Sequence, residues 1–187
     1  VHWPETMVTW FEEEGTLFSG DAFGTFGSID EDVIDEDGTF EQFNDEMTRY
    51  YACIVGKYGV PVQTALKKLG GFPIKRICST HGPVWEKHAR QVIGQYESLS
   101  RYEAEPGVCI VYGTMYGNTA EAARSLEREI SLLGIPTALH NLNVENGSAA
   151  LRDLFRYNTL AVGSPTYNGG VFPPVEAFMR AVTSRMV

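Results

Sequence analysis

The sequence contains few cysteines, and none of them forms a recognisable pair. Cys53, Cys78 and Cys109 are scattered, odd in number and without a C-x-x-C motif. This pattern argues against a disulfide framework and against a zinc ribbon. We therefore expect each cysteine to be a small buried apolar residue in a protein of a reducing compartment, the cytoplasm.

Long apolar runs and an excess of positive charge are also missing. No apolar run approaches the roughly 20 residues that span a bilayer, so no membrane partner is expected. The chain has 24 acidic and 15 basic residues and a net charge of −9. Because nucleic-acid binding depends on neutralising phosphates with Lys and Arg, this balance argues against a nucleic-acid partner. It is compatible with solubility and, equally, with steering of a positively charged partner.

A short apolar stretch, Val108 to Tyr112, is followed by the sequence T-M-Y-G-N-T and then by a helical pattern. A strand that leads through a small hydroxyl-rich loop into a helix is typical of a phosphate site, since backbone N–H groups and the helix dipole meet the anion. The loop lacks the Lys of a P-loop and the glycines of a dinucleotide fingerprint. A phosphate monoester that carries a flat ring fits better, and this points to FMN. The candidate binding residues are Thr114, Met115, Tyr116, Gly117, Asn118 and Thr119.

A second unusual loop follows a second apolar strand. Thr159 to Gly163 is apolar, the sequence S-P-T-Y-N-G comes next, and Pro173 begins a further helix. The candidate binding residues of this loop are Ser164, Pro165, Thr166, Tyr167, Asn168 and Gly169. The order is β-α-β-α-β-α, and in a doubly wound sheet of order 2-1-3-4-5 the loops after strands 1 and 3 flank the ligand site. Alternatively, Gly, Asn and Ser only make tight turns at these positions.

The remaining elements are expected from periodicity and turn residues. In the first region we expect strands at Thr16–Ser19 and Lys75–Ser79, a loop from Gly20 to Gly38, and helices at Phe40–Tyr58, Val62–Leu69 and Trp85–Leu99. A polar connector is expected at Tyr102–Gly107, and after it helical positions Ala123, Leu126, Ile130 and Leu133, a strand at Pro136–Leu139 and a helix at Ser148–Phe155. The connector divides the chain into two regions.

Three polar residues of the first region have the chemistry of metal ligands. Asp21 lies in L-F-S-G-D-A-F-G and His81 in S-T-H-G-P-V-W, each just past an expected strand, while His2 opens H-W-P-E-T. Histidine and carboxylate together suit Zn, Fe or Mn, and a carboxylate can bridge two ions. Taken singly, each also has an ordinary interpretation: a terminal residue, a turn former and a loop histidine.

In this order, and followed by a flavodoxin-like region, the three motifs resemble those of the flavodiiron proteins. The resemblance implies an α/β fold: residues 1–105 as the C-terminal part of a metallo-β-lactamase-like αββα domain, and residues 106–187 as the first half of a flavodoxin-like doubly wound parallel sheet. It implies that His2 and His81 are terminal ligands of two separate irons and that Asp21 bridges them as the catalytic centre. The family's H-x-E-x-D-H motif is absent, so we expect an internal fragment of a longer protein.

The resemblance also implies an activity and partners. A flavodiiron protein reduces O2 to water or NO to N2O at a non-haem diiron site, while FMN relays electrons. Rubredoxin or a similar small carrier is the expected donor, and the expected assembly is a head-to-tail homodimer or a tetramer. Two other functions stay open at this point: a flavodoxin-like electron carrier with a non-catalytic metal-domain remnant, and a dinuclear zinc hydrolase fused to a flavin module.

Overall fold

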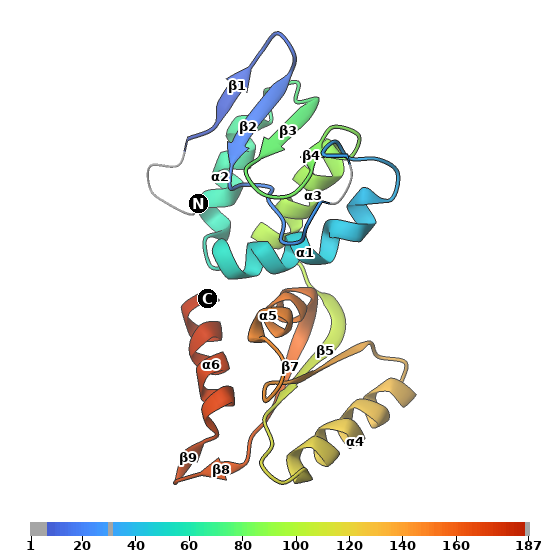
Figure 1. Ribbon diagram of the computed structural model, residues 1–187, viewed down its shortest axis with the longest axis vertical. Helices are drawn as coiled ribbons and strands as arrows, with labels where there is room; N and C mark the ends of the chain where they lie inside the picture. Colours follow the sequence, from blue (N-terminus) through green and yellow to red (C-terminus); the bar gives the residue numbers. More distant parts are fainter. Residues whose placement is uncertain (1–6, 30–31, 186–187) are drawn as a thin grey trace. The chain divides into compact units, whose positions relative to one another are not determined.

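The computed structural model describes residues 7–29 and 32–185, and the chain divides into two compact units, Val1–Glu103 and Ala104–Val187 (Figure 1). Each unit has a sheet of its own with helices packed against it. The described strands and helices of the first unit are β1 (Thr9–Phe11), β2 (Thr16–Gly20), α1 (Thr39–Ile54), α2 (Gly59–Leu69), β3 (Arg76–Ser79), β4 (Val84–Trp85) and α3 (Ala89–Ser100).

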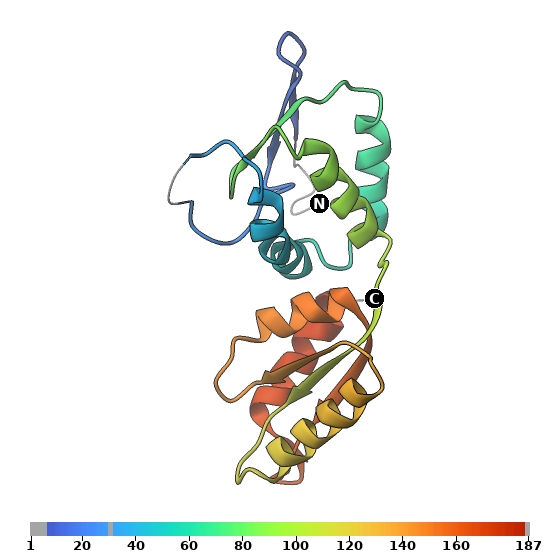
Figure 2. The same cartoon turned by 90° about the vertical axis from the view of Figure 1, so that its right-hand side faces the viewer.

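The sheet of the first unit has the order β1-β2-β3-β4, and its central pair, β2 and β3, is parallel. Leu17 lies opposite Ile77 in this pair, and both side chains are fully buried together with Trp85 of β4. Helices α2 and α3 lie on the same side of the sheet, as Figure 2 shows. The expected strands near residues 16–19 and 75–79 are confirmed.

All three helix predictions in this unit are wrong at an end, and α2 begins at Gly59 rather than Val62. Helix α1 stops at Ile54 rather than Tyr58, because Gly56 has a φ of +48° and turns the chain. Tyr58 is 44% exposed, whereas the expected stripe residues Phe43, Met47 and Tyr50 are buried. Helix α3 begins at Ala89, because Trp85 pairs with Ile77 in the short strand β4.

The second unit is a three-stranded parallel sheet with helices on both faces (Figure 2). Its described elements are β5 (Glu105–Tyr112), α4 (Asn118–Leu132), β6 (Thr137–Asn141), α5 (Gly147–Arg156), β7 (Tyr157–Gly163), β8 (Thr166–Tyr167), β9 (Gly170–Val171) and α6 (Pro173–Arg185). The strand order β6-β5-β7 is the predicted order 2-1-3, so the α/β fold with a parallel flavodoxin-like sheet is confirmed.

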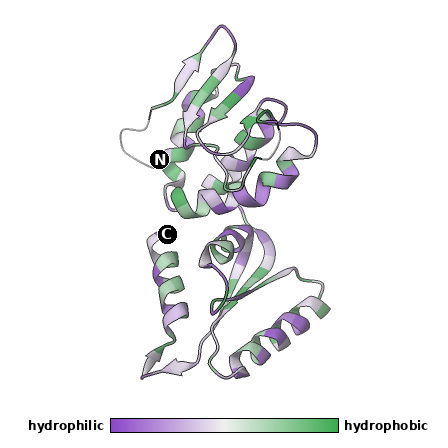
Figure 3. Cartoon of the chain, viewed as in Figure 1, coloured by the Kyte–Doolittle hydropathy of each residue, from purple (hydrophilic) through white to green (hydrophobic). Residues whose placement is uncertain are grey.

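The central strand β5 forms the core of this unit. Its residues from Cys109 to Tyr112 are all buried, as expected for a parallel strand that is covered on both faces. Figure 3 shows the mixed hydropathy of helix α4, whose residues Ala120 and Ala123 pack against this strand. The predicted apolar stripe is wrong at two positions, since Leu126 is 42% exposed and Leu133, just after the helix, is 76% exposed.

Three other local predictions need correction. The predicted connector Tyr102–Gly107 is partly strand, because β5 begins at Glu105, which pairs with Tyr157. The register of this pairing is irregular between Glu105 and Val108, where Pro106 has no N–H to donate. The Ser164–Gly169 segment is more regular than a loop, because it includes most of the β8–β9 hairpin. Among the cysteines, none of which is in a disulfide, Cys109 is buried as expected, whereas Cys53 and Cys78 are half-buried.

Candidate functional site

The loop between β5 and α4 carries the first group of predicted binding residues. Helix α4 begins at Asn118, directly after Gly117, whose φ is +92°. No side chain in the described residues caps this end of the helix, so its first N–H groups remain available to an anion. Met115, Tyr116 and Asn118 are exposed here, and Tyr116 is 87% exposed. The loop thus offers an open, electropositive helix end.

Thr114 is held in place by a residue that sequence reasoning missed. The Thr114 N–H donates to Oδ1 of Asn143 at 2.8 Å, and Nδ2 of Asn143 donates back to the Thr114 carbonyl oxygen at 2.8 Å. Thr114 Oγ1 then accepts a hydrogen bond from the Gly117 N–H at 3.0 Å. Asn143 follows β6, and its position just past the carboxyl end of an expected strand was the signal that could have identified it.

The second predicted loop begins beside the first. The Gly113 N–H donates to the Gly163 carbonyl oxygen at 3.0 Å, so β5 and β7 end side by side. Ser164 Oγ accepts a hydrogen bond from the Phe172 N–H at 3.0 Å, which closes the base of the β8–β9 hairpin. Asn168 and Gly169 form the turn, with φ values of +52° and +79°.

The two groups of predicted FMN residues therefore come together in the second unit. They follow adjacent parallel strands at the same edge of the sheet, where doubly wound folds bind ligands. Tyr167 is 45% exposed, and its ring lies 5.8 Å from that of Phe172. The arrangement offers N–H donors on one loop and exposed aromatic rings on both loops.

In the first unit, Asp21 and His81 lie close together as a possible metal-binding pair. Asp21 follows β2, His81 follows β3, and Gly20 is paired with Ser79 at the ends of these parallel strands. The distance from Asp21 Oδ1 to His81 Nε2 is 3.5 Å, and Thr80 Oγ1 donates to the same carboxylate oxygen at 2.7 Å. Both side chains remain partly exposed, Asp21 at 34% and His81 at 54%.

The backbone around this pair is tightly constrained. Phe23 has a φ of +65°, its buried ring lies 4.6 Å from that of Tyr96, and its carbonyl oxygen accepts a hydrogen bond from Trp85 Nε1 at 3.1 Å. Gly82 has a φ of +85°, and a Cβ there would lie 2.2 Å from Thr25 Oγ1. Strained backbone that is held by packing is a recurrent feature of functional sites.

The Tyr50 ring packs against His81, with 5.7 Å between the ring centroids. Burial, and then the nearby Asp21 carboxylate, raise the pKa of Tyr50 to about 12. The phenol therefore stays protonated at neutral pH. It contributes an aromatic wall and a neutral hydroxyl next to the Asp21–His81 pair.

The third predicted ligand, His2, lies outside the described residues. Within residues 7–29 and 32–185, no group of three or more His, Cys, Asp or Glu side chains is arranged to hold a metal ion. Asp21 and His81 supply one carboxylate and one imidazole, which is a donor pair suited to iron or zinc. These two residues alone do not complete a metal site.

A buried ion pair elsewhere in this unit was also missed from the sequence. The fully buried Asp35 carboxylate accepts hydrogen bonds from the N–H groups of Glu86, Lys87 and His88, and it lies 2.6 Å from Nδ1 of His88. Burial by itself would raise the Asp35 pKa, but these hydrogen bonds outweigh it and hold the pKa below its usual value. Asp35 therefore fixes residues 86–88, which lead into α3, from a distant loop.

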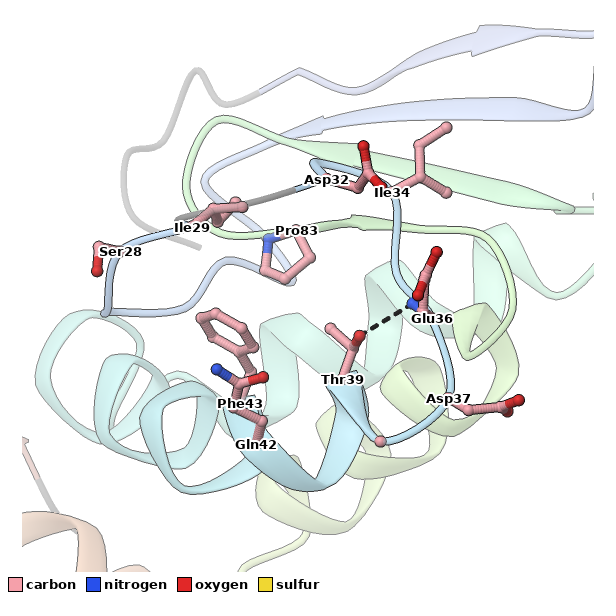
Figure 4. A pocket seen from close by; sticks show the side chains of 11 residues that line it. Ser28, Ile29, Asp32, Ile34, Glu36, Asp37, Thr39, Gln42, Phe43 and Pro83 are labelled. Carbon is pink, nitrogen blue, oxygen red and sulfur yellow. Dashed lines mark hydrogen bonds between the residues drawn. The ribbon is translucent and has the colours of Figure 1, made fainter.

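The Asp35 loop borders a pocket of about 530 Å³ (Figure 4). Its lining residues are Ser28, Ile29, Asp32, Ile34, Glu36, Asp37, Gly38, Thr39, Gln42, Phe43 and Pro83. Neither Asp21 nor His81 belongs to this lining. The pocket is therefore separate from the possible metal-binding pair.

Comparison with known proteins agrees with both units. The flavodoxin family model matches residues 110–186. The anaerobic nitric oxide reductase flavorubredoxin of Aeromonas hydrophila is 28% identical over 187 residues, which cover 98% of this chain and 38% of that protein. An uncharacterised protein of Methanocaldococcus jannaschii is 29% identical over 181 residues, which cover 96% of this chain and 45% of that protein.

Solved structures resemble the chain over nearly its whole length. The flavodiiron protein from Giardia intestinalis matches with a TM-score of 0.93 and 26% identity, over 98% of this chain and 45% of that one. Rubredoxin:oxygen oxidoreductase from Desulfovibrio gigas matches with a TM-score of 0.91 and 26% identity, over 98% of this chain and 46% of that one. The second unit thus has a flavodoxin-like α/β fold. The whole chain is a relative of the flavodiiron proteins, as the sequence motifs indicated, and it spans less than half the length of these relatives.

None of the helices in the described part of the chain is long and apolar enough to cross a membrane.

Proposed function

We propose that the chain is part of a flavodiiron oxidoreductase. Residues 1–105 would be the C-terminal portion of a metallo-β-lactamase-like diiron domain, and residues 106–187 the N-terminal portion of a flavodoxin-like FMN domain. The observation that carries this proposal is the open N-terminus of α4, which lies beside the Ser164–Gly169 loop at the edge of a parallel sheet. The named relatives, a nitric oxide reductase and a rubredoxin:oxygen oxidoreductase, support it.

The residues of the second unit fit FMN. A Cβ on Gly117 would meet no atom within 4 Å, so the turn is open on that side. The start of α4 that follows it offers backbone N–H groups to an anion. Thr114, Asn118 and Thr119 add side-chain donors. Tyr116 and Tyr167 offer exposed rings for stacking on a flat heterocycle. Bound FMN would supply one- and two-electron transfer, and these residues would anchor and orient it.

For iron, the proposed ligands are Asp21 as the bridge and His81 and His2 as terminal ligands. The described residues do not complete a metal site, so we derive no reaction step through iron. O2 or NO as substrate, rubredoxin or a similar carrier as donor, a head-to-tail homodimer or tetramer, and a cytoplasmic location are part of the same proposal. The match of the flavodoxin family model to residues 110–186 favours one second candidate, a flavodoxin-like electron carrier.

An FMN titration tests the cofactor assignment. Quenching of flavin fluorescence should give saturable binding to the chain, and Asn118→Ala should weaken it by about tenfold if its amide contacts the phosphate. Asn158→Ala, at the opposite end of β7, is the matched control and should bind normally. No FMN binding by the unmodified protein, or equal affinity for both variants, would contradict the assignment.

Metal analysis separates the two candidates. If it is a flavodiiron enzyme, the full-length protein should purify with two irons per FMN, and Asp21→Ala in the full-length protein should lose both irons, because a bridging carboxylate serves both ions. Asp37→Ala removes a highly exposed carboxylate and serves as the control. FMN without iron in the unmodified protein would favour the electron carrier.

A further inference from the structure

Hydrogen bonds hold the loop that joins β6 to α5, residues 142–146, at several points: the Leu142 N–H donates to the Tyr112 carbonyl oxygen at 2.9 Å and the Asn143 N–H to Asn141 Oδ1 at 3.0 Å. Two side chains of the loop add contacts to other elements. One is Asn143, which makes its paired hydrogen bonds with the backbone of Thr114. The other is Glu145, whose Oε2 lies 2.9 Å from Nδ1 of His140 and whose Oε1 accepts a hydrogen bond from the Asn141 N–H at 3.1 Å. Only Val144 separates these two attachments. The loop thus connects a histidine of the sheet to the predicted phosphate loop.

His140 is buried between two carboxylates. Its side chain is 8% exposed, and its Nε2 lies 2.8 Å from Asp153 Oδ2 on α5. Since an ionised carboxylate only accepts hydrogen bonds, both ring nitrogens must carry protons to satisfy both partners. The geometry therefore fits an imidazolium ion with Glu145 on one side and Asp153 on the other.

The two carboxylates that flank His140 differ in burial and in their other partners. Asp153 is 2% exposed and also binds Arg152, with N–O distances of 2.9 and 2.8 Å, while Arg156 lies 4.0 Å away. Glu145 is 41% exposed and, in the contacts described for the loop, binds His140 and the Asn141 N–H. A neutral His140 keeps one N–H donor, and the buried Asp153 carboxylate needs it more than the partly exposed Glu145, which water can solvate. Loss of the His140 proton would therefore loosen the Glu145 side first.

We propose that the His140–Glu145 ion pair positions Asn143 against Thr114, and thereby makes the grip on the FMN phosphate depend on the protonation of His140. The inference rests on the proposed function, because it concerns the same flavin site. His140 and Glu145 act as positioning residues through Asn143, and neither of them contacts the flavin in this scheme.

The direction of the pH effect follows from the surroundings of His140. Burial alone would lower its pKa, but the hydrogen bonds and charges of Asp153 and Glu145 outweigh it and raise the pKa above the usual value. The ion pair is therefore complete at low pH and is lost as the pH rises through the raised pKa. Because a phosphate monoester is a dianion above about pH 7, a loss of affinity at higher pH cannot come from the ligand phosphate.

The test compares FMN with riboflavin, which has the same ring system but no phosphate. We expect Asn143→Ala and Glu145→Gln to weaken FMN binding by about five- to tenfold, a size set by the loss of one or two hydrogen bonds. Riboflavin affinity should change by less than about twofold, since the positioned loop contacts the phosphate. Asn158→Ala and Glu129→Gln, on exposed positions away from this loop, are the matched controls.

A pH series completes the test. As the pH rises through the raised pKa of His140, FMN affinity of the unmodified chain should fall, while that of Glu145→Gln should already be low and should change less. FMN affinities of both variants equal to that of the unmodified chain would overturn the inference. So would equal losses for FMN and riboflavin, because these would indicate a general structural defect. If the unmodified chain binds no FMN, the proposed function itself fails, which is a distinguishable result.

Discussion

Replacing Asp35 by Asn tests whether one buried carboxylate holds the segment that leads into α3. In the structure, Asp35 Oδ1 accepts from the N–H groups of Glu86 and Lys87, and Oδ2 accepts from that of His88. Asparagine keeps one oxygen and places an NH2 group where the second acceptor was. The His88 N–H then faces the new NH2 group instead of an acceptor. Because the side chain at position 35 is fully buried, water cannot replace the lost acceptor.

The expected loss of stability follows from these contacts. A buried N–H left without an acceptor costs about 1–3 kcal/mol, and the two remaining hydrogen bonds lose the strengthening of a charged acceptor. We expect Asp35→Asn to lower the free energy of unfolding of the first unit by about 2–3 kcal/mol at pH 7. Asp37→Asn, two residues along the same loop, removes an 88% exposed carboxylate that pairs with Lys87 at the surface. Because surface ion pairs contribute little, it should lower the free energy of unfolding far less than Asp35→Asn does.

Urea unfolding followed by tryptophan fluorescence is the appropriate assay, because all three tryptophans, at positions 3, 10 and 85, belong to the first unit. The Asp35 pKa is lowered by folding, so its stabilisation is complete above the unfolded value of about 3.9 and is lost as the pH falls through the folded pKa. The difference between Asp35→Asn and the unmodified chain should therefore shrink below about pH 4. A difference under about 0.5 kcal/mol at pH 7 would refute this role of Asp35.

Three further predictions concern other parts of the chain. Asp153→Asn should destabilise α5 and β6 by about 2 kcal/mol at neutral pH, as measured by hydrogen exchange. Burial alone would raise the pKa of Asp153, but its histidine and arginine partners lower it to about 2. The destabilisation should therefore vanish as the pH falls from about 4 to about 2. Gly82→Ala should destabilise the loop of His81 by more than about 1 kcal/mol in urea unfolding, since its φ is positive and its Cβ would clash with Thr25. Cys109 should resist alkylation at pH 8 in the folded chain and react on unfolding, by mass spectrometry, because burial and then the nearby Asp153 raise its pKa to about 12.

The parts of the fold that sequence reasoning predicted well are those with strong local signals. The second unit has a repeated strand–helix alternation with glycine-rich turns, and this alternation determines strand order once right-handed crossovers are assumed. Short elements were missed, since the two residues of Val84–Trp85 show no periodicity. The ends of α1 and α3 were misjudged because a turn at Gly56 ends the first helix and the pairing of Trp85 with Ile77 delays the second.

The candidate sites show the same division. Thr114, Asn118 and the Ser164 loop were identified from motifs that are contiguous in the sequence, and their assembly follows from strand order. Asn143 and Asp35 were missed because each acts on a backbone that is remote in sequence, Thr114 in one case and Glu86 to His88 in the other. Such contacts leave no spacing pattern in a single chain.

The parallel pairing of β2 with β3 has a consequence for synthesis on the ribosome. Strand β2 cannot pair with β3 until Ile77, the residue opposite Leu17, has been synthesised. Asp21 and His81 therefore meet only after a loop of nearly sixty residues has closed. In the second unit, Val108 finds Thr137 after a much shorter crossover. We therefore expect the histidine–aspartate pair to form late in refolding, and stopped-flow tryptophan fluorescence should show a slow phase that belongs to the first unit.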